Sequence, residues 1–324
     1  MISIYDINDA YGNIADVIRR TPVLTSRTLS AKTDNKMFLK GEHLQPTGAF
    51  KIRGATNKVR TVAEEGAKHI VTASSGNHGQ AVAYIAGKLG LEATIVVPEN
   101  AVSSKVAAIR GYGANIMTCG TTSTERLQKA EELTTEQEAV FIPPYDDPLI
   151  MAGQGTAGVE ILEQIPDVDA IYITIGGGGL ISGIATAVKE SRPDVKVIGV
   201  EPEQANDTFL SKKQGKLTAI ERADTIADGL RASQPGDLTF PVVQKYVDDI
   251  VLVTEDEITE ALVFVLERMK QLIEPSAAVA VAAAMTNKAG LHEKNICSVV
   301  SGGNMALDKL AGIIGGLSPV TLTR

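Results

Sequence analysis

The chain has 324 residues, of which 44% are hydrophobic and 22% charged, so it can bury the core of one large domain or two smaller ones. Its formal net charge of −8 argues against non-specific binding to nucleic acid. No apolar run is long enough for a secretory signal or a membrane span, and the distant cysteines Cys119 and Cys297 have no metal or redox spacing. We therefore expect a cytoplasmic protein with reduced thiols and no membrane or nucleic-acid partner.

Short runs rich in valine and isoleucine alternate with helical patterns along the chain, after an amphipathic helix predicted over residues 4–20. This alternation is typical of parallel sheets covered by helices. The predicted strands are 38–40, 69–73, 93–98, 140–143, 170–175, 196–200, 250–254 and 296–301. The predicted helices include 78–89, 104–110, 124–134, 154–164 and one that a capping box starts at 254 and that ends near 272.

A lysine stands where the first predicted strand gives way to a helix. Lys51 follows the turn-forming segment Pro46-Thr47-Gly48 and the aromatic Phe50. A helix N-terminus carries uncovered N–H groups, and together with partial burial these lower the pKa of an amine and favour its nucleophilic neutral form. A single lysine in this position is more often an ordinary surface side chain, so the inference depends on two later loops.

Both loops join a predicted strand to a predicted helix. The first, residues 74–80, reads Ser-Ser-Gly-Asn-His-Gly-Gln. The second is a run of four glycines, whose backbone N–H groups can close around a phosphate: Gly176, Gly177, Gly178 and Gly179. Either loop alone is compatible with a tight turn or a helix cap. The specific signal is the lysine and the two loops in this order.

Together these motifs resemble the pyridoxal-phosphate (PLP) enzymes of fold type II, the tryptophan-synthase-β-like fold. Five motifs narrow the resemblance to the serine racemase and threonine/serine dehydratase family, and they are 50–54, 74–80, 152–156, 274–276 and 301–304. The similarity runs from about Ile14 to Leu307.

The resemblance implies an α/β protein of two three-layer domains with mainly parallel sheets. A small domain, 68–145, is expected to be inserted in a large PLP-binding domain of 1–67 and 146–324. The chain is also expected to lack the C-terminal regulatory domain of biosynthetic threonine dehydratases.

For the cofactor, the resemblance implies that Lys51 bonds to PLP and then removes the Cα proton of the substrate. Phe50 would pack near the cofactor ring, Asn77 would bind the ring hydroxyl, and the four glycines would bind the phosphate. Ser301 would face the pyridine nitrogen, where a neutral hydroxyl makes the ring a weaker electron sink and favours elimination over transamination. Phe50 is equally compatible with a core aromatic, whereas for Ser301 the neighbouring Gly-Gly-Asn favours the functional role over a strand-end turn.

For the substrate, the resemblance implies a carboxylate site at the 74–80 loop, made by Ser74, Ser75, Asn77 and His78. Ser75 would also face Lys51 across the substrate as a second acid or base, since the racemase-like subgroup has serine here and catabolic threonine dehydratases often have alanine. Arg126 matches the position of a carboxylate-binding arginine, although a solvated surface arginine fits equally well. Ser233 is a further pocket candidate.

A metal site is also implied. Glu201, the carbonyl of Ala205 and Asp207 have the spacing at which the racemase-like subgroup binds Mg²⁺, Mn²⁺ or Ca²⁺, and all three offer hard oxygen donors. The alternative is an acidic loop on an acidic protein.

The leading functional hypothesis is a threonine/serine dehydratase (ammonia-lyase) that converts a β-hydroxy amino acid to a 2-oxo acid and ammonia. The alternatives are serine racemase, with Lys51 and Ser75 as two bases, threo-3-hydroxyaspartate ammonia-lyase, and a catalytically silent PLP-fold sensor. A homodimer is expected. Pro46 replaces a lysine that binds ATP in metazoan serine racemases, although Gln80, Lys105 and Tyr112 fit the rest of that pattern, and this argues against ATP as an effector.

Overall fold

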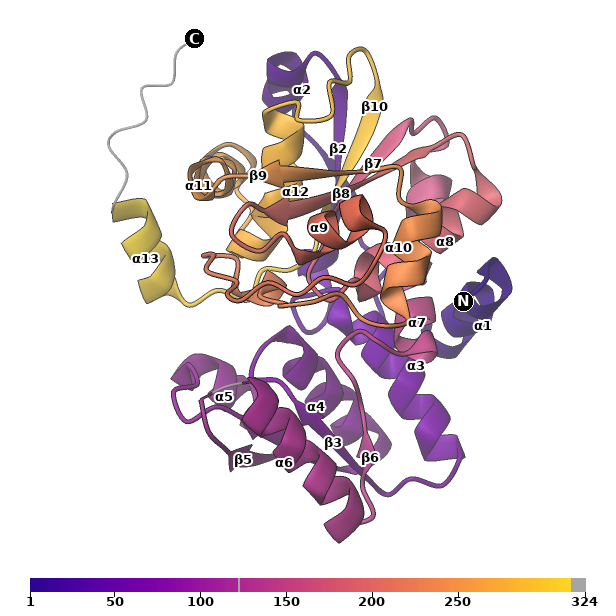
Figure 1. The fold of residues 1–324 in the computed structure, drawn as a ribbon, viewed down its shortest axis with the longest axis vertical. Helices are drawn as coiled ribbons and strands as arrows, with labels where there is room; N and C mark the ends of the chain where they lie inside the picture. Colours follow the sequence, from indigo (N-terminus) through magenta and orange to yellow (C-terminus); the bar gives the residue numbers. More distant parts are fainter. Residues whose placement is uncertain (122, 316–324) are drawn as a thin grey trace.

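Two sheets organise the molecule, a computed structural model that describes residues 1–121 and 123–315 (Figure 1). The end of the predicted large domain, 316–324, lies outside the described residues. The larger sheet has the order β1-β2-β10-β7-β8-β9, with β1 antiparallel to β2 and the remaining pairs parallel. The smaller sheet is parallel throughout, in the order β5-β4-β3-β6. The strands are β1 (Val23–Thr25), β2 (Lys36–Gly41), β3 (His69–Ala73), β4 (Glu92–Val97), β5 (Asn115–Thr118), β6 (Val140–Phe141), β7 (Ala170–Thr174), β8 (Lys196–Pro202), β9 (Asp249–Val253) and β10 (Asn295–Val300).

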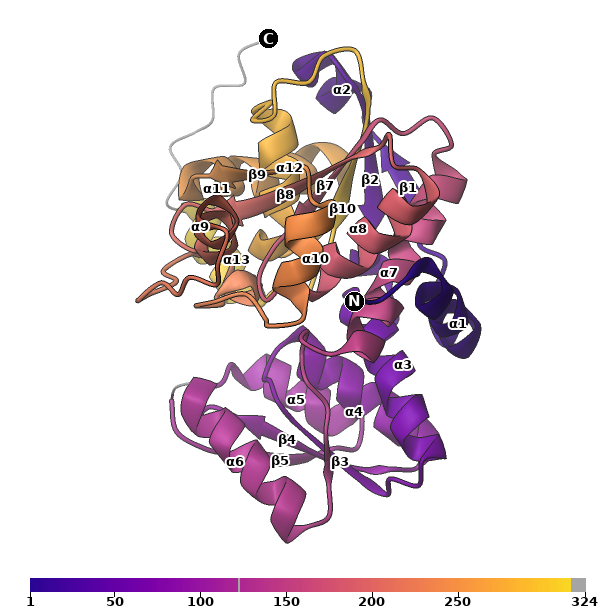
Figure 2. The same ribbon diagram turned by 45° about the vertical axis from the view of Figure 1, so that its right-hand side comes forward.

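Helices connect and cover these strands (Figure 2). The α-helices are α1 (Ile4–Ile14), α2 (Arg27–Thr33), α3 (Lys51–Glu64), α4 (Asn77–Leu89), α5 (Ser103–Gly111), α6 (Ser123–Glu136), α7 (Pro148–Gln164), α8 (Gly179–Ser191), α9 (Asp207–Gln214), α10 (Thr239–Tyr246), α11 (Glu255–Phe264), α12 (Pro275–Met285) and α13 (Leu307–Gly315). Among the described residues, three short helical segments occur: η1 (Glu42–Leu44), η2 (Asp228–Leu230) and the π-helical η3 (Val265–Met269). Among residues 1–121 and 123–315, no helix is long and apolar enough to cross a membrane.

Alternation of side chains along the strands gives the larger sheet two apolar faces and hence three layers. On β7, Ala170 and Tyr172 point into a core with α11 and α12, whereas Ile171 and Ile173 point into a core with α7, α8 and α10. Helix α12 is buried along its whole length, which explains why its sequence is apolar on every side.

The smaller sheet is built on the same principle. Ile70 and Ile95 pack on the side of α3, α4 and α5, and Val71 and Val96 pack on the side of α6. The predicted fold class is therefore confirmed. All four strands of this sheet lie within the range predicted for the small domain, 68–145, and the domain boundaries themselves stay a prediction.

The differences from the predicted elements lie mostly at ends and edges. All eight predicted strands are present, whereas the short edge strands β1 and β5 were not predicted. Helix α1 ends at Ile14 rather than at residue 20, because the chain then turns and returns Val17 to the core. The capping box at Thr254 is confirmed, but α11 gives way to a π-helical turn after Phe264.

A fully buried group of ion pairs joins elements that are distant in sequence. The side chains of Lys40, Glu42, Arg53 and Glu160 are all inaccessible to solvent. The Arg53 guanidinium donates to Glu42 at 2.7 Å and to Glu160 at 2.8 Å, and the Lys40 amine donates to Glu160 at 2.5 Å. Two positive and two negative charges therefore balance within this network, which connects β2, η1, α3 and α7.

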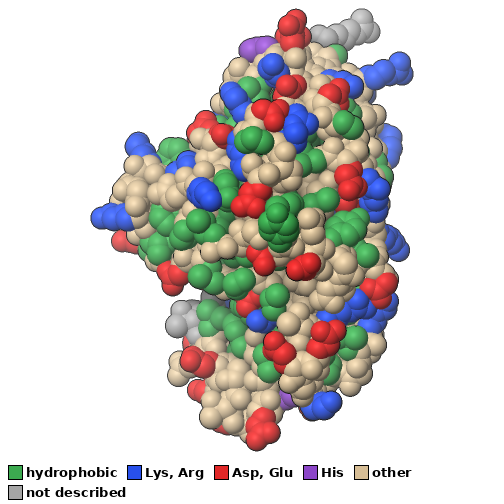
Figure 3. Space-filling model, turned by 90° about the vertical axis from the view of Figure 1, so that its right-hand side faces the viewer, with side chains coloured by type: hydrophobic (Ala, Val, Ile, Leu, Met, Phe, Trp, Pro, Cys, Tyr) green, Lys and Arg blue, Asp and Glu red, His purple; other side chains and the backbone are tan. Residues whose placement is uncertain are grey.

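The surface carries mixed charge. On the face shown in Figure 3, basic and acidic side chains are interspersed rather than gathered into one basic patch. This distribution agrees with the acidic net charge of the sequence.

We predict that Arg53→Met lowers the free energy of unfolding by about 3–5 kcal/mol, because it leaves buried carboxylates without their main partner. Urea unfolding followed by circular dichroism measures the change. The matched control is Arg60→Met, whose partner Asp16 is 68% exposed, and this change should cost about 1 kcal/mol or less. Equal losses in the two variants would contradict the assigned role of the network.

Candidate active site

The predicted lysine lies where the turn before α3 meets the segment after β10. The two segments run side by side, with the Phe50 N–H donating to the Ser301 carbonyl at 3.0 Å and the Gly303 N–H to the Gly48 carbonyl at 2.9 Å. Ser301 is only 3% exposed. The structure thus brings Lys51, Phe50 and Ser301 together, as the sequence predicted for one side of a cofactor site.

The Lys51 amine is held in a desolvated position. Its Nζ donates to the Pro144 carbonyl at 2.6 Å and lies 5.1 Å from the centre of the Phe50 ring. Loss of solvent lowers the pKa of Lys51 to about 8, and the negative charge of Glu274 opposes this shift. A substantial fraction of the amine is therefore neutral near physiological pH, as a nucleophile or a proton acceptor requires.

The glycine loop adopts a shape that other residues would not permit. Gly178 has φ of +89°, and a Cβ on Gly177 would lie 2.4 Å from the ring of Tyr145. Helix α8 begins at Gly179 without a side-chain cap, so its first N–H groups are available to an anion. The loop therefore fits the phosphate of PLP.

Asn77 starts α4 and is held by two other segments. Its Nδ2 donates to the Glu274 carboxylate at 2.7 Å, and its Oδ1 accepts from Asn304 Nδ2 at 2.9 Å. Asn304 Nδ2 also donates to the Thr47 carbonyl at 2.7 Å, on the turn before Lys51. These bonds place Asn77 at the same site as Lys51 and Ser301, where a bond to the cofactor's ring hydroxyl was expected.

His78 is buried and neutral. Its Nε2 lies 3.0 Å from the Ile142 carbonyl and must donate to it, and burial followed by the charge of Lys51 lowers its pKa to about 3. Its Nδ1 is a buried lone pair without a hydrogen-bond partner in the described part of the chain. Any contribution of His78 to binding a carboxylate must therefore come from its backbone N–H at the start of α4, and not from its imidazole.

The serines of this loop and the remaining predicted substrate residues occupy three places. Ser74 and Ser75 are half-buried between β3 and α4, and the Ser74 hydroxyl accepts from the Gly76 N–H at 3.3 Å. Arg126 is half-buried on α6, where its Nη1 donates to the Thr121 carbonyl at 3.4 Å. Ser233 is exposed in the loop after η2, and its carbonyl accepts from the Ile220 N–H. Their roles toward a substrate stay predictions.

Glu201 and Asp207 form a second, fully buried acidic site at the end of β8 and the start of α9. Glu201 accepts from the N–H groups of Thr208 and Phe209, whereas neither oxygen of Asp207 has a hydrogen-bond partner among the described residues. Burial and the charge of Asp207 raise the pKa of Glu201 to about 8, and burial raises that of Asp207 to about 7. Buried Ala205 lies between them in sequence. A divalent cation would satisfy these orphaned oxygens.

No cluster of three or more His, Cys, Asp or Glu side chains that could hold a metal occurs in residues 1–121 and 123–315. A cation at Glu201 and Asp207 would therefore depend on a backbone carbonyl and water as further ligands.

Two residues at the site were not assigned a role from the sequence. Tyr145 packs its ring on the glycine loop, and Glu274 holds Asn77. An aromatic residue directly after Pro143-Pro144 is a weak signal for the first. The signal for Glu274 is a carboxylate directly before a proline and a wholly apolar helix, a place where it is expected to be buried.

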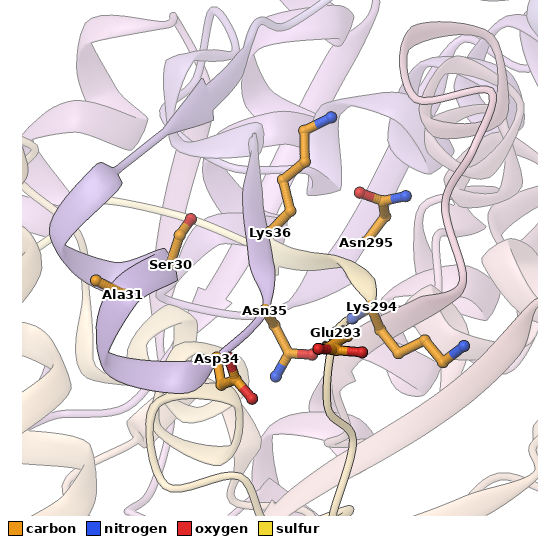
Figure 4. A pocket seen from close by; sticks show the side chains of 8 residues that line it. All are labelled: Ser30, Ala31, Asp34, Asn35, Lys36, Glu293, Lys294 and Asn295. Atoms are coloured by element: carbon orange, nitrogen blue, oxygen red, sulfur yellow. Dashed lines mark hydrogen bonds between the residues drawn. The ribbon is translucent and has the colours of Figure 1, made fainter.

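The pocket drawn in Figure 4 belongs to another part of the molecule. Its volume is about 450 Å³, and it is lined by Ser30, Ala31, Asp34, Asn35, Lys36, Glu293, Lys294 and Asn295. Lys36 and Asn295 begin β2 and β10, whereas the candidate site lies beyond the carboxyl ends of these strands. We place the chemistry at the carboxyl ends, where ligands bind in open parallel sheets.

Comparison with known proteins gives a family match and several similar relatives. Residues 14–302 match the family model described as pyridoxal-phosphate dependent enzyme. The chain is 46% identical to serine racemase of Homo sapiens (94% of this chain, 92% of the relative) and 43% identical to L-threonine ammonia-lyase of Thermotoga maritima (97% and 78%). It is 41% identical to L-threo-3-hydroxyaspartate ammonia-lyase of Saccharomyces cerevisiae (96% of both chains). The structure of maize serine racemase superposes with a TM-score of 0.92 at 39% identity, covering 97% of both chains.

We predict that His78 stays neutral, as the Nε2–H tautomer, from pH 5 to pH 8, because its pKa lies near 3. Long-range ¹H–¹⁵N correlation spectra of the imidazoles, assigned with a His78→Gln variant, measure this directly. A His78 resonance that changes from the neutral to the imidazolium form between pH 5 and pH 8 would contradict the buried tautomer.

Proposed function

Because the chain belongs to the family of pyridoxal-phosphate-dependent enzymes, we propose that it is an ammonia-lyase that removes water from L-threonine or L-serine and yields a 2-oxo acid and ammonia. The observation that carries this proposal is the Lys51 amine, whose pKa is near 8 and which lies with Asn77 and Ser301 around one site. The glycine loop that follows β7 fits the cofactor's phosphate.

Bound PLP would supply an aldehyde that bonds to an amine and a ring that withdraws electrons from the substrate Cα. The protein supplies the proton transfers. Neutral Lys51 would accept the Cα proton, which allows the Cβ–O bond to break, and would return this proton to the leaving hydroxide, so that water is released and Lys51 is neutral again. The remaining enamine is then hydrolysed to the 2-oxo acid and ammonia.

Other groups orient the reacting atoms. The uncapped N-terminus of α4 offers N–H groups to the substrate carboxylate, beside the hydroxyls of Ser74 and Ser75. Arg126 and Ser233 are further candidates for substrate contact. With PLP bound, Ser301 would offer a neutral hydroxyl to the pyridine nitrogen, and Phe50 would support the ring.

Serine racemisation is the second candidate activity, and the identity of Ser75 favours it. A hydroxyl here provides an acid or base that alanine could not, and racemisation needs proton transfer on both faces of Cα. Elimination needs the Lys51 face only. The yeast relative named for L-threo-3-hydroxyaspartate makes that amino acid the third substrate to examine.

We further propose that Glu201, the Ala205 carbonyl and Asp207 bind one Mg²⁺, Mn²⁺ or Ca²⁺ ion. The buried Asp207 carboxylate without hydrogen-bond partners in the described residues supports this proposal. The cation would balance two carboxylates that otherwise destabilise the folded state at neutral pH. We also expect a cytoplasmic homodimer without ATP as an effector, since Pro46 replaces the lysine that binds ATP in metazoan serine racemases.

The function is tested with a panel of L-threonine, L-serine, D-serine and L-threo-3-hydroxyaspartate. We expect 2-oxo acid and ammonia in equal amounts from L-threonine and L-serine, measured by coupled assay together with the enantiomer ratio by chiral chromatography. Activity on the hydroxyaspartate alone would replace the preferred substrate. No product from any of the four would contradict the proposal.

Ser75→Ala separates the two proposed activities. We predict that it lowers conversion of L-serine to D-serine by about 100-fold or more, while elimination from L-threonine stays within about tenfold of the wild type. Chiral chromatography of serine gives the first rate, and 2-oxo acid formation from L-threonine gives the second. If Ser75 only binds the substrate carboxylate, L- and D-substrates should lose activity alike, mainly through KM.

EDTA should lower the melting temperature and Mg²⁺, Mn²⁺ or Ca²⁺ should restore it. A cation at 100 times its Kd adds about 2.7 kcal/mol, or about 4 °C for a chain of this length. Calorimetry of the wild type, Asp207→Ala and the control Glu203→Ala, whose exposed side chain lies in the same loop, tests the site. The response should vanish only in Asp207→Ala, and a wild type that ignores both chelator and metal would leave only an acidic loop.

A further inference from the structure

One buried carboxyl at the active site has no role in the chemistry described above. Glu274 is 5% exposed and occupies the N-cap position of α12, yet it makes no capping bond to that helix. Burial first, and the charge of Asp228 second, raise the pKa of Glu274 to about 7. A buried carboxyl that does not cap its own helix needs another reason for its place.

The structure supplies that reason in the contacts of Glu274. Its Oε1 accepts from Asn77 Nδ2 at 2.7 Å, and its backbone N–H donates to the Gly302 carbonyl at 3.1 Å. A Cβ on Gly302 would lie 2.6 Å from the same carboxylate oxygen. Glu274 is therefore packed between the start of α4 and the segment that contains Ser301.

These contacts fix the direction of the Asn77 amide. Because Asn304 Nδ2 donates to the Thr47 carbonyl, the same amide nitrogen also faces Asn77. The Asn77 atom that accepts its second hydrogen bond must therefore be Oδ1. Asn77 Nδ2 then faces the Glu274 carboxylate. One Nδ2–H of Asn77 remains for another acceptor, and the ring hydroxyl oxygen of PLP is the expected one.

Charged groups from four elements act on Glu274. Lys105 of α5 pairs with Asp228 of η2 at 2.9 Å, and Lys309 of α13 approaches the same carboxylate at 3.4 Å. Asp228 disfavours ionisation of Glu274, whereas Lys105 and Lys309 favour it. From α3, Lys51 interacts with the Glu274 charge, which stabilises its ammonium form.

We propose that Glu274 is a positioning residue of the cofactor site: its carboxylate fixes the Asn77 amide so that one N–H points to the cofactor's ring hydroxyl. This inference rests on the proposed PLP chemistry. It adds a role for a residue that does not touch the reacting atoms.

The first test is a double-mutant cycle on cofactor affinity, measured by equilibrium dialysis of the full chain with PLP. Glu274→Ala and Asn77→Ala should each raise the Kd for PLP by about tenfold, and the double variant should bind no worse than about twofold beyond either single variant. Affinity equal to the wild type in Glu274→Ala, or losses that multiply to about 100-fold, would overturn the positioning role.

The second test uses Glu274→Gln, which keeps the size and one acceptor oxygen of the side chain. Because this oxygen can still accept from Asn77 Nδ2, PLP affinity should stay within about threefold of the wild type. A loss of affinity as large as that of Glu274→Ala would overturn the positioning role.

A control variant and a reference measurement make the outcomes decisive. Glu255→Gln removes another carboxylate at a helix start, where it accepts from the Ile226 N–H, and it should leave PLP affinity unchanged. The melting temperature of each variant shows whether weaker PLP binding comes from a destabilised fold or from a displaced Asn77 amide. Failure of the wild type to bind PLP would refute the proposed function, whereas normal PLP binding and turnover with unaltered Glu274 variants would refute only this inference.

Discussion

The buried ion pairs of Arg53 are the constraint on which the rest of the site depends. Arg53 lies two residues after Lys51, and its guanidinium is tied to Glu42 before the turn and to Glu160 on α7. Moving the start of α3 would separate Arg53 from Glu42 or Glu160 and leave a buried charge without its partner. These pairs therefore allow little displacement of that helix end. The lysine is thus carried on a fixed helix end, where desolvation sets its pKa, rather than on a mobile loop.

Charge balance separates the structural groups from the functional ones. In the Arg53 network two cations meet two carboxylates, and each is satisfied by hydrogen bonds. At the acidic site of Glu201 and Asp207, two buried carboxyls lie together, and their pKa values rise to about 8 and about 7. Such imbalance costs stability and is typical of places where a ligand, a cation or a proton completes the site.

Local patterns predict part of this arrangement and long-range contacts decide the rest. Strand-like runs, most of them rich in valine and isoleucine, predicted eight of the strands, and four glycines between strand and helix marked the turn before α8, because both signals depend on neighbouring residues alone. The neutral tautomer of His78 depends on the Ile142 carbonyl, and the role of Glu274 depends on Asn77, 197 residues earlier. The end of α1 at Ile14 and the ring of Tyr145 on the glycine loop depend on tertiary packing in the same way.

The most direct test of the account is to identify the residue that bonds to the cofactor. The full chain is incubated with PLP, reduced with borohydride, digested and mapped by mass spectrometry. The account predicts a reduced PLP adduct on the wild-type peptide that contains Lys51 and no adduct in Lys51→Ala. Formation of 2-oxo acid should be lost in the borohydride-reduced wild type and in Lys51→Ala. An adduct on a different lysine, or full activity in Lys51→Ala, would contradict it.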